Sequence, residues 1–240
     1  MEIASTSLDY YAGDTLCKGE YFSPENSSGK LPVVLVCYAW DGLIDEVRDK
    51  ARKLAESGYI AFALDVYGDG KTYSDITTEL DEALGPYMAD RGLLLERLQA
   101  GLDAAKTIPN ADDSRIASMG YCFGGMCVLD LARSGADDLK AAVSFHGALA
   151  PNDLKSPETI NTKLLVLHGH DDPMIPQEHV TGFMAEMTQK KADWQFVSYS
   201  GTVHAFTRPD ANMPEIGAMY NPSTDRRSWQ AMLNFFAEVL

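Results

Sequence analysis

The chain has 240 residues, 45% of them hydrophobic, which is enough to bury a sizeable core without disulfide or metal crosslinks. Its 20 Lys and Arg against 35 Asp and Glu give a formal net charge of −15, which disfavours nucleic acid and anionic membranes as partners. No apolar run reaches the roughly 18 residues of a bilayer span, and residues 1–7 lack the basic and apolar regions of a secretory signal, so we expect a soluble cytoplasmic protein.

Short runs rich in β-branched residues alternate with longer stretches of helical spacing along the chain. Residues 3–11 and 15–23 flank Ala12-Gly13-Asp14 and predict an N-terminal hairpin. The elements predicted after it are, in chain order, a strand at 33–38, a helix at 44–57, a strand at 59–66, a helix at 93–105, a strand at 115–119, a helix at 123–133, strands at 140–145 and 163–167, a helix at 176–190, a strand at 194–199 and a helix at 225–239. A polar helical stretch after Gly68-Asp69-Gly70 is expected to break at Gly85-Pro86.

This alternation predicts an α/β fold in which βαβ units build a mostly parallel central sheet, with helices on both faces. The N-terminal hairpin is expected to add an antiparallel edge to that sheet. Composition does not shift enough anywhere to mark a linker, so residues 1–240 are expected to form a single domain. Ligands of such sheets bind beyond the carboxyl ends of the strands, which is where catalytic residues are expected.

The most specific functional motif lies between the predicted strand 115–119 and helix 123–133. Gly120-Tyr121-Cys122-Phe123-Gly124-Gly125 has the Gly-x-nucleophile-x-Gly pattern of a nucleophile elbow, a turn too tight for bulky flanking residues. Cys122 at its apex would project above the sheet at a helix N-terminus, where free N–H groups and the helix dipole favour a thiolate. The alternatives are a glycine-rich turn with an incidental cysteine and a dinucleotide-binding loop, although Gly-x-x-x-Gly-Gly is not the Gly-x-Gly-x-x-Gly pattern of such loops.

The remaining cysteines are Cys17, Cys37 and Cys127. The four together show neither a disulfide framework nor the paired CxxC spacing of a metal site. Most cysteines of this kind are inert packing residues. Cys127 falls inside the predicted helix and is expected to belong to the core.

A thiol nucleophile needs a base, and in this class of fold the chain order is nucleophile, acid, histidine. The chain offers five histidines: His146, His168, His170, His179 and His204. His204 follows the predicted strand 194–199 after a four-residue loop, in the required position. His146 ends a strand and is expected either to line the pocket or to be a hydrogen-bonded structural residue, and His179 is expected on a helix surface.

Two adjacent aspartates compete for the acid. The strand 163–167 leads into His168-Gly169-His170-Asp171-Asp172, and counting from Gly169 places Asp172 in the acid position. Asp172 would accept a hydrogen bond from His204 Nδ1 and so hold the imidazole in the useful tautomer. Asp171 is then a loop residue that caps backbone amides or bonds its neighbours.

The chain resembles the dienelactone hydrolase family of α/β-hydrolases, whose hallmark is a Cys-His-Asp triad. The matching motifs are Asp65-Val66-Tyr67-Gly68, Gly120-Tyr121-Cys122-Phe123-Gly124-Gly125, Phe145-His146-Gly147, His168-Gly169 with Asp172, and His204-Ala205-Phe206-Thr207-Arg208. They fall in order between about residue 31 and residue 240. The cysteine elbow followed by His-x-Phe is specific, because most α/β-hydrolases carry serine.

By position, the resemblance implies that Cys122, Asp172 and His204 are the triad. It also implies that the backbone amides of Trp40 and Phe123 form the oxyanion hole, and that Arg208 binds the substrate carboxylate. Tyr121 and His146 are further candidates for contact with substrate. The expected activity is hydrolysis of a small ester or lactone by acyl transfer through Cys122, with no cofactor and no metal.

Two departures from the family pattern weaken the assignment of dienelactone as substrate. Ala39 stands where the archetype has a glutamate, and a second substrate-binding arginine expected in the loop 68–90 has no counterpart, Arg91 being the nearest. Without that glutamate, Cys122 should be free to pair with His204 before substrate arrives. The alternative is that Asp41, or a residue of the loop 67–75, supplies the missing carboxylate.

Two other functions compete with this interpretation. His168-Gly169-His170-Asp171-Asp172 has the His-x-His-x-Asp spacing of some metal sites, so a metal-dependent hydrolase is the first alternative. However, His168 ends an apolar strand and no further histidine pair offers a second set of ligands. The second alternative is an α/β-hydrolase fold that binds a small ligand without catalysis, against which the intact triad argues.

Overall fold

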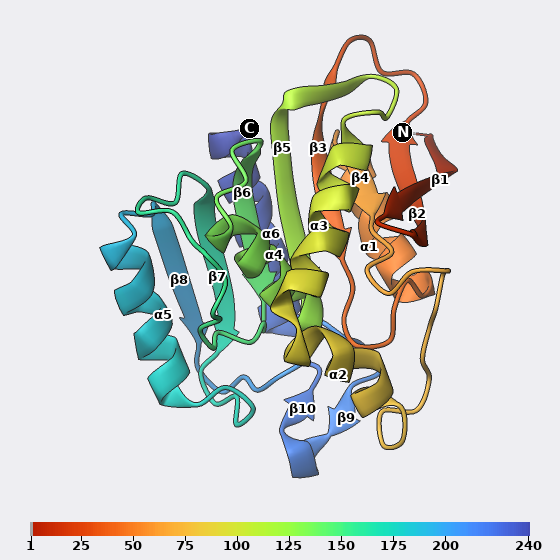
Figure 1. Cartoon of the computed structure of the whole chain (residues 1–240). Coiled ribbons are helices and arrows are strands. Elements are labelled where there is room, and N and C mark those ends of the chain that lie inside the picture. The colour runs from red at the N-terminus through yellow and green to blue at the C-terminus, as the bar shows by residue number, and fades with distance from the viewer. Residues whose placement is uncertain (1) are drawn as a thin grey trace.

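The computed structural model describes residues 2–240 (Figure 1). Its strands are β1 (Ile3–Ala12), β2 (Thr15–Pro24), β3 (Leu31–Cys37), β4 (Ile60–Ala63), β5 (Ala111–Tyr121), β6 (Leu139–Phe145), β7 (Lys163–Gly169), β8 (Trp194–Tyr199), β9 (Asn212–Met213) and β10 (Ala218–Met219). Its helices are α1 (Asp45–Glu56), α2 (Leu80–Ala89), α3 (Arg91–Ala105), α4 (Phe123–Arg133), α5 (Gln177–Gln189) and α6 (Pro222–Val239), with a 3₁₀ turn η1 (Pro214–Ile216).

Eight strands form one sheet in the order β1-β2-β4-β3-β5-β6-β7-β8. The pairs from β4 through β3 to β8 are parallel, whereas β1 with β2 and β2 with β4 are antiparallel. Helix α3 lies in front of the sheet and helices α1 and α6 lie behind it (Figure 1). The predicted α/β fold, with a parallel sheet led by an antiparallel hairpin, is therefore confirmed.

The central strands of the sheet are continuous apolar runs because both of their faces are buried. Residues 33–37 of β3 are almost fully inaccessible to solvent, because helices cover both faces of the parallel strands. Helix α1 instead shows the spacing of a half-buried helix, with Val47, Ala51, Leu54 and Ala55 turned to the core. Within residues 2–240, no helix is both long enough and apolar enough to cross a membrane.

The prediction that a helix breaks at Gly85-Pro86 is wrong. Pro86 lies inside α2, which continues to Ala89. Two features offset the missing N–H of the proline: Ala83 and Tyr87 are buried and anchor the helix, and the carbonyl of Pro86 still accepts from the N–H of Asp90. Asp90 then caps α3, since its side chain accepts from the N–H of Leu93.

Several predicted boundaries also differ from those in the structure. Strand β5 is longer than the predicted 115–119, because its first residues pair with the start of β3. Helix α6 begins at Pro222 rather than at residue 225, with the side chain of Asn221 as its cap and proline in its first turn. The pair β9 and β10 was not predicted, since two-residue strands carry no periodicity.

A buried charge network joins the helices that cover the front of the sheet. The side chain of Asp130 on α4 is fully buried and accepts hydrogen bonds from Arg91 Nε at 2.8 Å, Arg133 Nη1 at 3.2 Å and Asn152 Nδ2 at 2.6 Å. Arg133 also binds Glu186 on α5. Arg91 is thus bound to a buried carboxylate inside the fold.

Replacing Asp130 by Asn should destabilise the protein by about 3–5 kcal/mol, because two guanidinium groups then lose the buried charge that compensates them. The free energy of unfolding in urea measures this change. Asp138→Asn is a matched control: that half-exposed carboxylate pairs with Lys106, and its loss should cost less than about 1 kcal/mol. Equal effects of the two substitutions would contradict the assignment of Asp130 as the centre of the network.

Candidate active site

The turn between β5 and α4 has the geometry of a nucleophile elbow. Cys122 adopts φ 53° and ψ −113°, a backbone conformation that is uncommon outside glycine and is held only where the surroundings enforce it. The N–H of Cys122 donates to the carbonyl of Phe145 at 3.0 Å. A Cβ on Gly120 would overlap the carbonyl of Gly124, and one on Gly124 would overlap the carbonyl of Cys37, so neither position admits a side chain.

Cys122 differs from the other cysteines in its exposure. Its side chain is partly accessible, whereas Cys17, Cys37 and Cys127 are buried. Burial raises the pKa of Cys17 to about 11 and that of Cys37 to about 12, and it raises the pKa of Cys127 well above its ordinary value. These three thiols are packing groups, as expected for Cys127.

His204 and Asp172 meet at the carboxyl end of the sheet. His204 Nδ1 lies 2.8 Å from Asp172 Oδ2, and the other carboxylate oxygen of Asp172 accepts from the N–H of Met174 at 2.9 Å. Asp171 is exposed and makes no contact of this kind. Of the two competing aspartates, Asp172 is therefore the one that lies against the histidine.

The other ring nitrogen of His204 is buried and makes no hydrogen bond within the described residues. Burial lowers the pKa of His204, but the charge of Cys122 and the hydrogen bond to Asp172 oppose it and raise the pKa to about 10. The ring therefore lies within electrostatic range of the thiol. A proton on Nε2 would be stabilised between Cys122 and Asp172.

A short segment that sequence analysis missed fixes the position of His204. The N–H of His204 donates to the carbonyl of Gly217 at 2.9 Å, and the carbonyl of His204 accepts from the N–H of Met219 at 3.0 Å. His204 thus pairs with Ala218 of β10 as an isolated bridge. The backbone of the histidine is held on both sides, although its loop has no regular structure of its own.

His146 and Tyr121 flank these groups. The ring centroid of His146 lies 5.0 Å from that of His204, and its Nε2 is 2.8 Å from the hydroxyl of Thr207. Burial and the neighbouring His204 lower the pKa of His146 well below its ordinary value, so it is neutral. Tyr121 precedes Cys122 and packs its ring on Phe145, and its hydroxyl is buried and has no hydrogen-bond partner among residues 2–240.

The two candidate oxyanion residues follow the carboxyl ends of the adjacent parallel strands β3 and β5. Trp40 follows β3 and Phe123 begins α4 directly after β5, and Cys37 is paired with Gly120 in the sheet. Tyr67 joins the two sides: its hydroxyl donates to the carbonyl of Trp40 at 2.7 Å, and its ring stacks on Phe123 at 5.8 Å. The peptide of Trp40 is therefore fixed by a buried tyrosine.

Arg208 lies four residues after His204 and is surrounded by carboxylates. Its Nη1 donates to Asp41, its Nε donates to Asp210 at 2.8 Å and lies 3.7 Å from Glu46. Burial lowers the pKa of Arg208, but these carboxylates raise it above its ordinary value. Asp41 thus binds Arg208, rather than standing free to replace the glutamate absent at Ala39.

The proposed metal motif does not form a cluster. The ring of His168 is buried against Phe196, that of His170 is exposed and lies 3.2 Å from the hydroxyl of Ser198, and Asp172 binds His204. In the part of the chain that the structure describes, no group of three or more His, Cys, Asp or Glu side chains is arranged to hold a metal ion. The alternative of a metal-dependent hydrolase therefore lacks a geometric basis.

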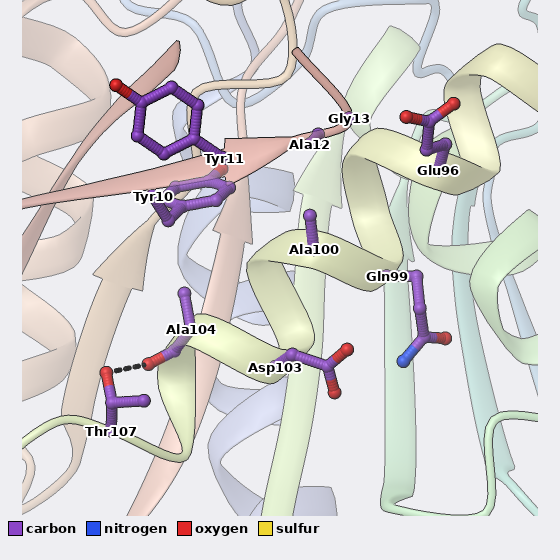
Figure 2. A pocket seen from close by; sticks show the side chains of 10 residues that line it. All are labelled: Tyr10, Tyr11, Ala12, Gly13, Glu96, Gln99, Ala100, Asp103, Ala104 and Thr107. Carbon is purple, nitrogen blue, oxygen red and sulfur yellow. Dashed lines mark hydrogen bonds between the residues drawn. The ribbon is translucent and has the colours of Figure 1, made fainter. Parts of the chain in front are cut away.

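A surface pocket of about 520 Å³, lined by none of these residues, lies between the turn of the β1–β2 hairpin and helix α3 (Figure 2). Its lining comprises Tyr10, Tyr11, Ala12, Gly13, Glu96, Gln99, Ala100, Asp103, Ala104 and Thr107. It contains no histidine and no cysteine, so it offers neither a nucleophile of the expected kind nor its base.

A mostly parallel sheet with an elbow after β5, and a histidine and an aspartate in contact after β8 and β7, defines an α/β-hydrolase. Residues 18–240 match the dienelactone hydrolase family. The chain belongs to the dienelactone hydrolase family.

Known relatives support the same family. A solved structure of a dienelactone hydrolase-like promiscuous phosphotriesterase from metagenomic libraries is 38% identical, with a TM-score of 0.94 over 100% of this chain and 99% of that one. A Salmonella typhimurium protein provisionally named carboxymethylenebutenolidase is 31% identical over 232 residues, which cover 91% of this chain and 81% of the relative. A Klebsiella pneumoniae structure provisionally described as a dienelactone hydrolase is 28% identical, with a TM-score of 0.82 over 99% of both chains.

Cys122 should react with iodoacetamide at pH 6 at a rate within about tenfold of its rate at pH 8. Despite burial of the ring, the charge of Cys122 and the hydrogen bond to Asp172 raise the pKa of His204 to about 10, so a thiolate at Cys122 and a protonated His204 would stabilise each other across this interval. Mass spectrometry of labelled peptides measures the rate at each cysteine, and the buried Cys17, Cys37 and Cys127 serve as internal controls. His204→Gln should abolish the labelling at pH 6.

A free thiol with a pKa of about 8.5 would lose nearly all of its reactivity between pH 8 and pH 6, by about 70-fold. Such a loss at Cys122 would contradict a resting pair between Cys122 and His204. It would instead favour a thiol that ionises only when substrate binds.

Proposed function

We propose that the protein hydrolyses small carboxylic esters or lactones through an acyl-enzyme on Cys122. The observation that supports this most directly is the His204–Asp172 contact of 2.8 Å, with the second ring nitrogen left unbonded and within electrostatic range of an elbow cysteine. A nucleophile, a base and a residue that orients the base are the three parts needed for acyl transfer.

Acylation begins with attack of the Cys122 sulfur on the carbonyl carbon, which forms a C–S bond and places negative charge on the carbonyl oxygen. The N–H groups of Trp40 and Phe123 are proposed to bind that oxygen, and the helix dipole of α4 favours the charge. Collapse of the intermediate breaks the bond to the alcohol oxygen. The proton on His204 Nε2 passes to that leaving group.

Deacylation uses the same groups in reverse. Neutral His204 accepts a proton from water at Nε2, and the resulting hydroxide attacks the thioester carbonyl. The second intermediate expels the Cys122 thiolate and leaves the carboxylic acid. Asp172 holds His204 in the tautomer that presents Nε2 to substrate, and it stabilises the imidazolium that forms at each step.

Phosphotriester hydrolysis is a second candidate activity. It is favoured by the 38% identity and the TM-score of 0.94 to the structure described as a promiscuous phosphotriesterase. Oxyanion donors that point at a developing negative charge can serve a phosphoryl oxygen as well as a carbonyl oxygen. Binding without catalysis is the remaining alternative, and a trapped acyl group on Cys122 would exclude it.

Cys122→Ala should lower kcat for p-nitrophenyl butyrate by at least about 10³-fold without unfolding, because the elbow accepts a small residue and the nucleophile is lost. His204→Ala should lower kcat by a similar factor, since the residues act as a unit. The assay is release of p-nitrophenolate from this ester and, in parallel, from paraoxon. Activity of Cys122→Ala within about tenfold of wild type would mean that another residue is the nucleophile.

Asp172→Asn should lower kcat by about 10⁴-fold, the size seen when a triad aspartate is replaced and the histidine takes the wrong tautomer. Asp171→Asn is the matched control and should stay within about threefold of wild type, because Asp171 is exposed and does not contact His204. Steady-state kinetics with the same ester compare the two. A larger loss of kcat in Asp171→Asn than in Asp172→Asn would mean that Asp171 is the residue that orients His204.

A further inference from the structure

A charged cluster lies beside the proposed oxyanion hole. It comprises Arg208, Asp41, Glu46 and Asp210, and Asp41 directly follows Trp40 in the sequence. On the other side, Arg208 follows Thr207, whose hydroxyl bonds His146 against the ring of His204. The cluster therefore connects the loop after β3 with the loop that carries the catalytic base.

Within this cluster, one cation faces three carboxylates. All three guanidinium nitrogens of Arg208 face acids: Nη1 faces Asp41, Nε faces Asp210 and Glu46, and Nη2 lies 3.5 Å from Asp210 Oδ2. Burial raises the pKa of Glu46, which favours its neutral form. Even with Glu46 uncharged, Asp41 and Asp210 leave the cluster with a net negative charge.

Breaking the ion pairs of Arg208 so that it could bind a substrate carboxylate would cost free energy. The side chain of Asp41 is only 4% exposed, so it would remain as a buried carboxylate without its partner. An incoming carboxylate would also be repelled by the charges that already surround the guanidinium. The family role of this arginine, to bind a substrate carboxylate, is thus opposed by its own neighbours in this chain.

Two other cations, Lys50 near Thr207 and Arg91, are also occupied. Lys50 donates to the carbonyl of Thr207 at 3.0 Å and lies 3.8 Å from Asp225. Arg91 binds the buried Asp130. Neither of them offers a free positive charge to an anionic substrate.

Resting on the proposed esterase function, we infer that the site selects esters with an uncharged or cationic acyl group and discriminates against acyl groups that carry a carboxylate. The juxtaposition of Arg208 with Asp41, Glu46 and Asp210, between the residue that follows Trp40 and the loop of His204, produces this preference. Arg208 acts in it as a structural tie between two loops. Carboxylate-bearing lactones are accordingly poor substrates.

Three p-nitrophenyl esters of similar length test the inference: the hexanoate, the monoester of adipic acid and the 5-(trimethylammonio)pentanoate. At about 20 mM salt, where screening is weak, kcat/KM for the hexanoate should exceed that for the monoadipate by at least about tenfold. The value of kcat/KM for the cationic ester should equal or exceed that for the hexanoate. Raising the salt to about 0.5 M should reduce the differences in kcat/KM between charged and neutral esters, because salt screens the charges of the cluster.

Variants locate the source of the discrimination. Asp210→Asn and Asp41→Asn should each raise kcat/KM for the monoadipate relative to the hexanoate by about threefold or more, because each removes one charge of the cluster. Asp210 is the exposed carboxylate of the cluster, so Asp210→Asn tests the inference even if Asp41→Asn fails to fold. Asp113→Asn is the matched control: it also removes one exposed carboxylate, about 26 Å away along β5 from Tyr121, and should leave the ratio unchanged.

The outcomes separate this inference from the proposed function. Hydrolysis of the monoadipate as fast as the hexanoate or faster, with a loss confined to the monoadipate in Arg208→Gln, would overturn the inference while the esterase function stands. An equal effect of Asp113→Asn and Asp210→Asn would also overturn it, since the discrimination would then come from net charge alone. Failure to cleave any of the three esters would remove the proposed function and the inference with it.

Discussion

The close approach of helix α4 to the end of strand β3 is the constraint on which the candidate site depends. Gly124 lies directly against the backbone carbonyls of Cys37 and Tyr38, and Gly125 lies against Ser144 and Gly147. This packing forces the chain at Cys122 into its unusual backbone conformation. The same approach brings the first turn of α4 beside the loop after β3, so that Trp40 and Phe123, 83 positions apart in the sequence, are available for the proposed oxyanion hole.

The fold and the central residues were predictable because their signals are local. A continuous apolar run predicts a buried parallel strand, and glycines spaced around a cysteine predict a turn that admits no flanking side chains. The contact between His204 and Asp172 also followed from the order of elements along the chain. Pro86 misled the prediction, because burial of Ala83 and Tyr87 outweighs the hydrogen bond that a proline removes.

What could not be predicted depends on contacts between distant segments. Arg208 and Asp41 lie 167 residues apart, and nothing near either residue in the sequence indicates that they meet. The position of a residue in a motif therefore says less about its role than the charges packed around it. The pairing of β10 with His204 is equally invisible, since two residues of strand show no pattern.

The hold on His204 has a consequence for how the protein responds to heat. Two backbone hydrogen bonds, to Gly217 and from Met219, fix the backbone of His204, and side-chain contacts of Thr207 and Arg208 hold the rest of its loop, whereas Cys122 sits on a turn enclosed by the central sheet. Loops at the edge of a fold open at lower free energy than the central sheet that carries them. On warming, His204 and Cys122 should therefore separate while the sheet is still intact, so that the proposed catalysis stops in a local and reversible event before the fold is lost.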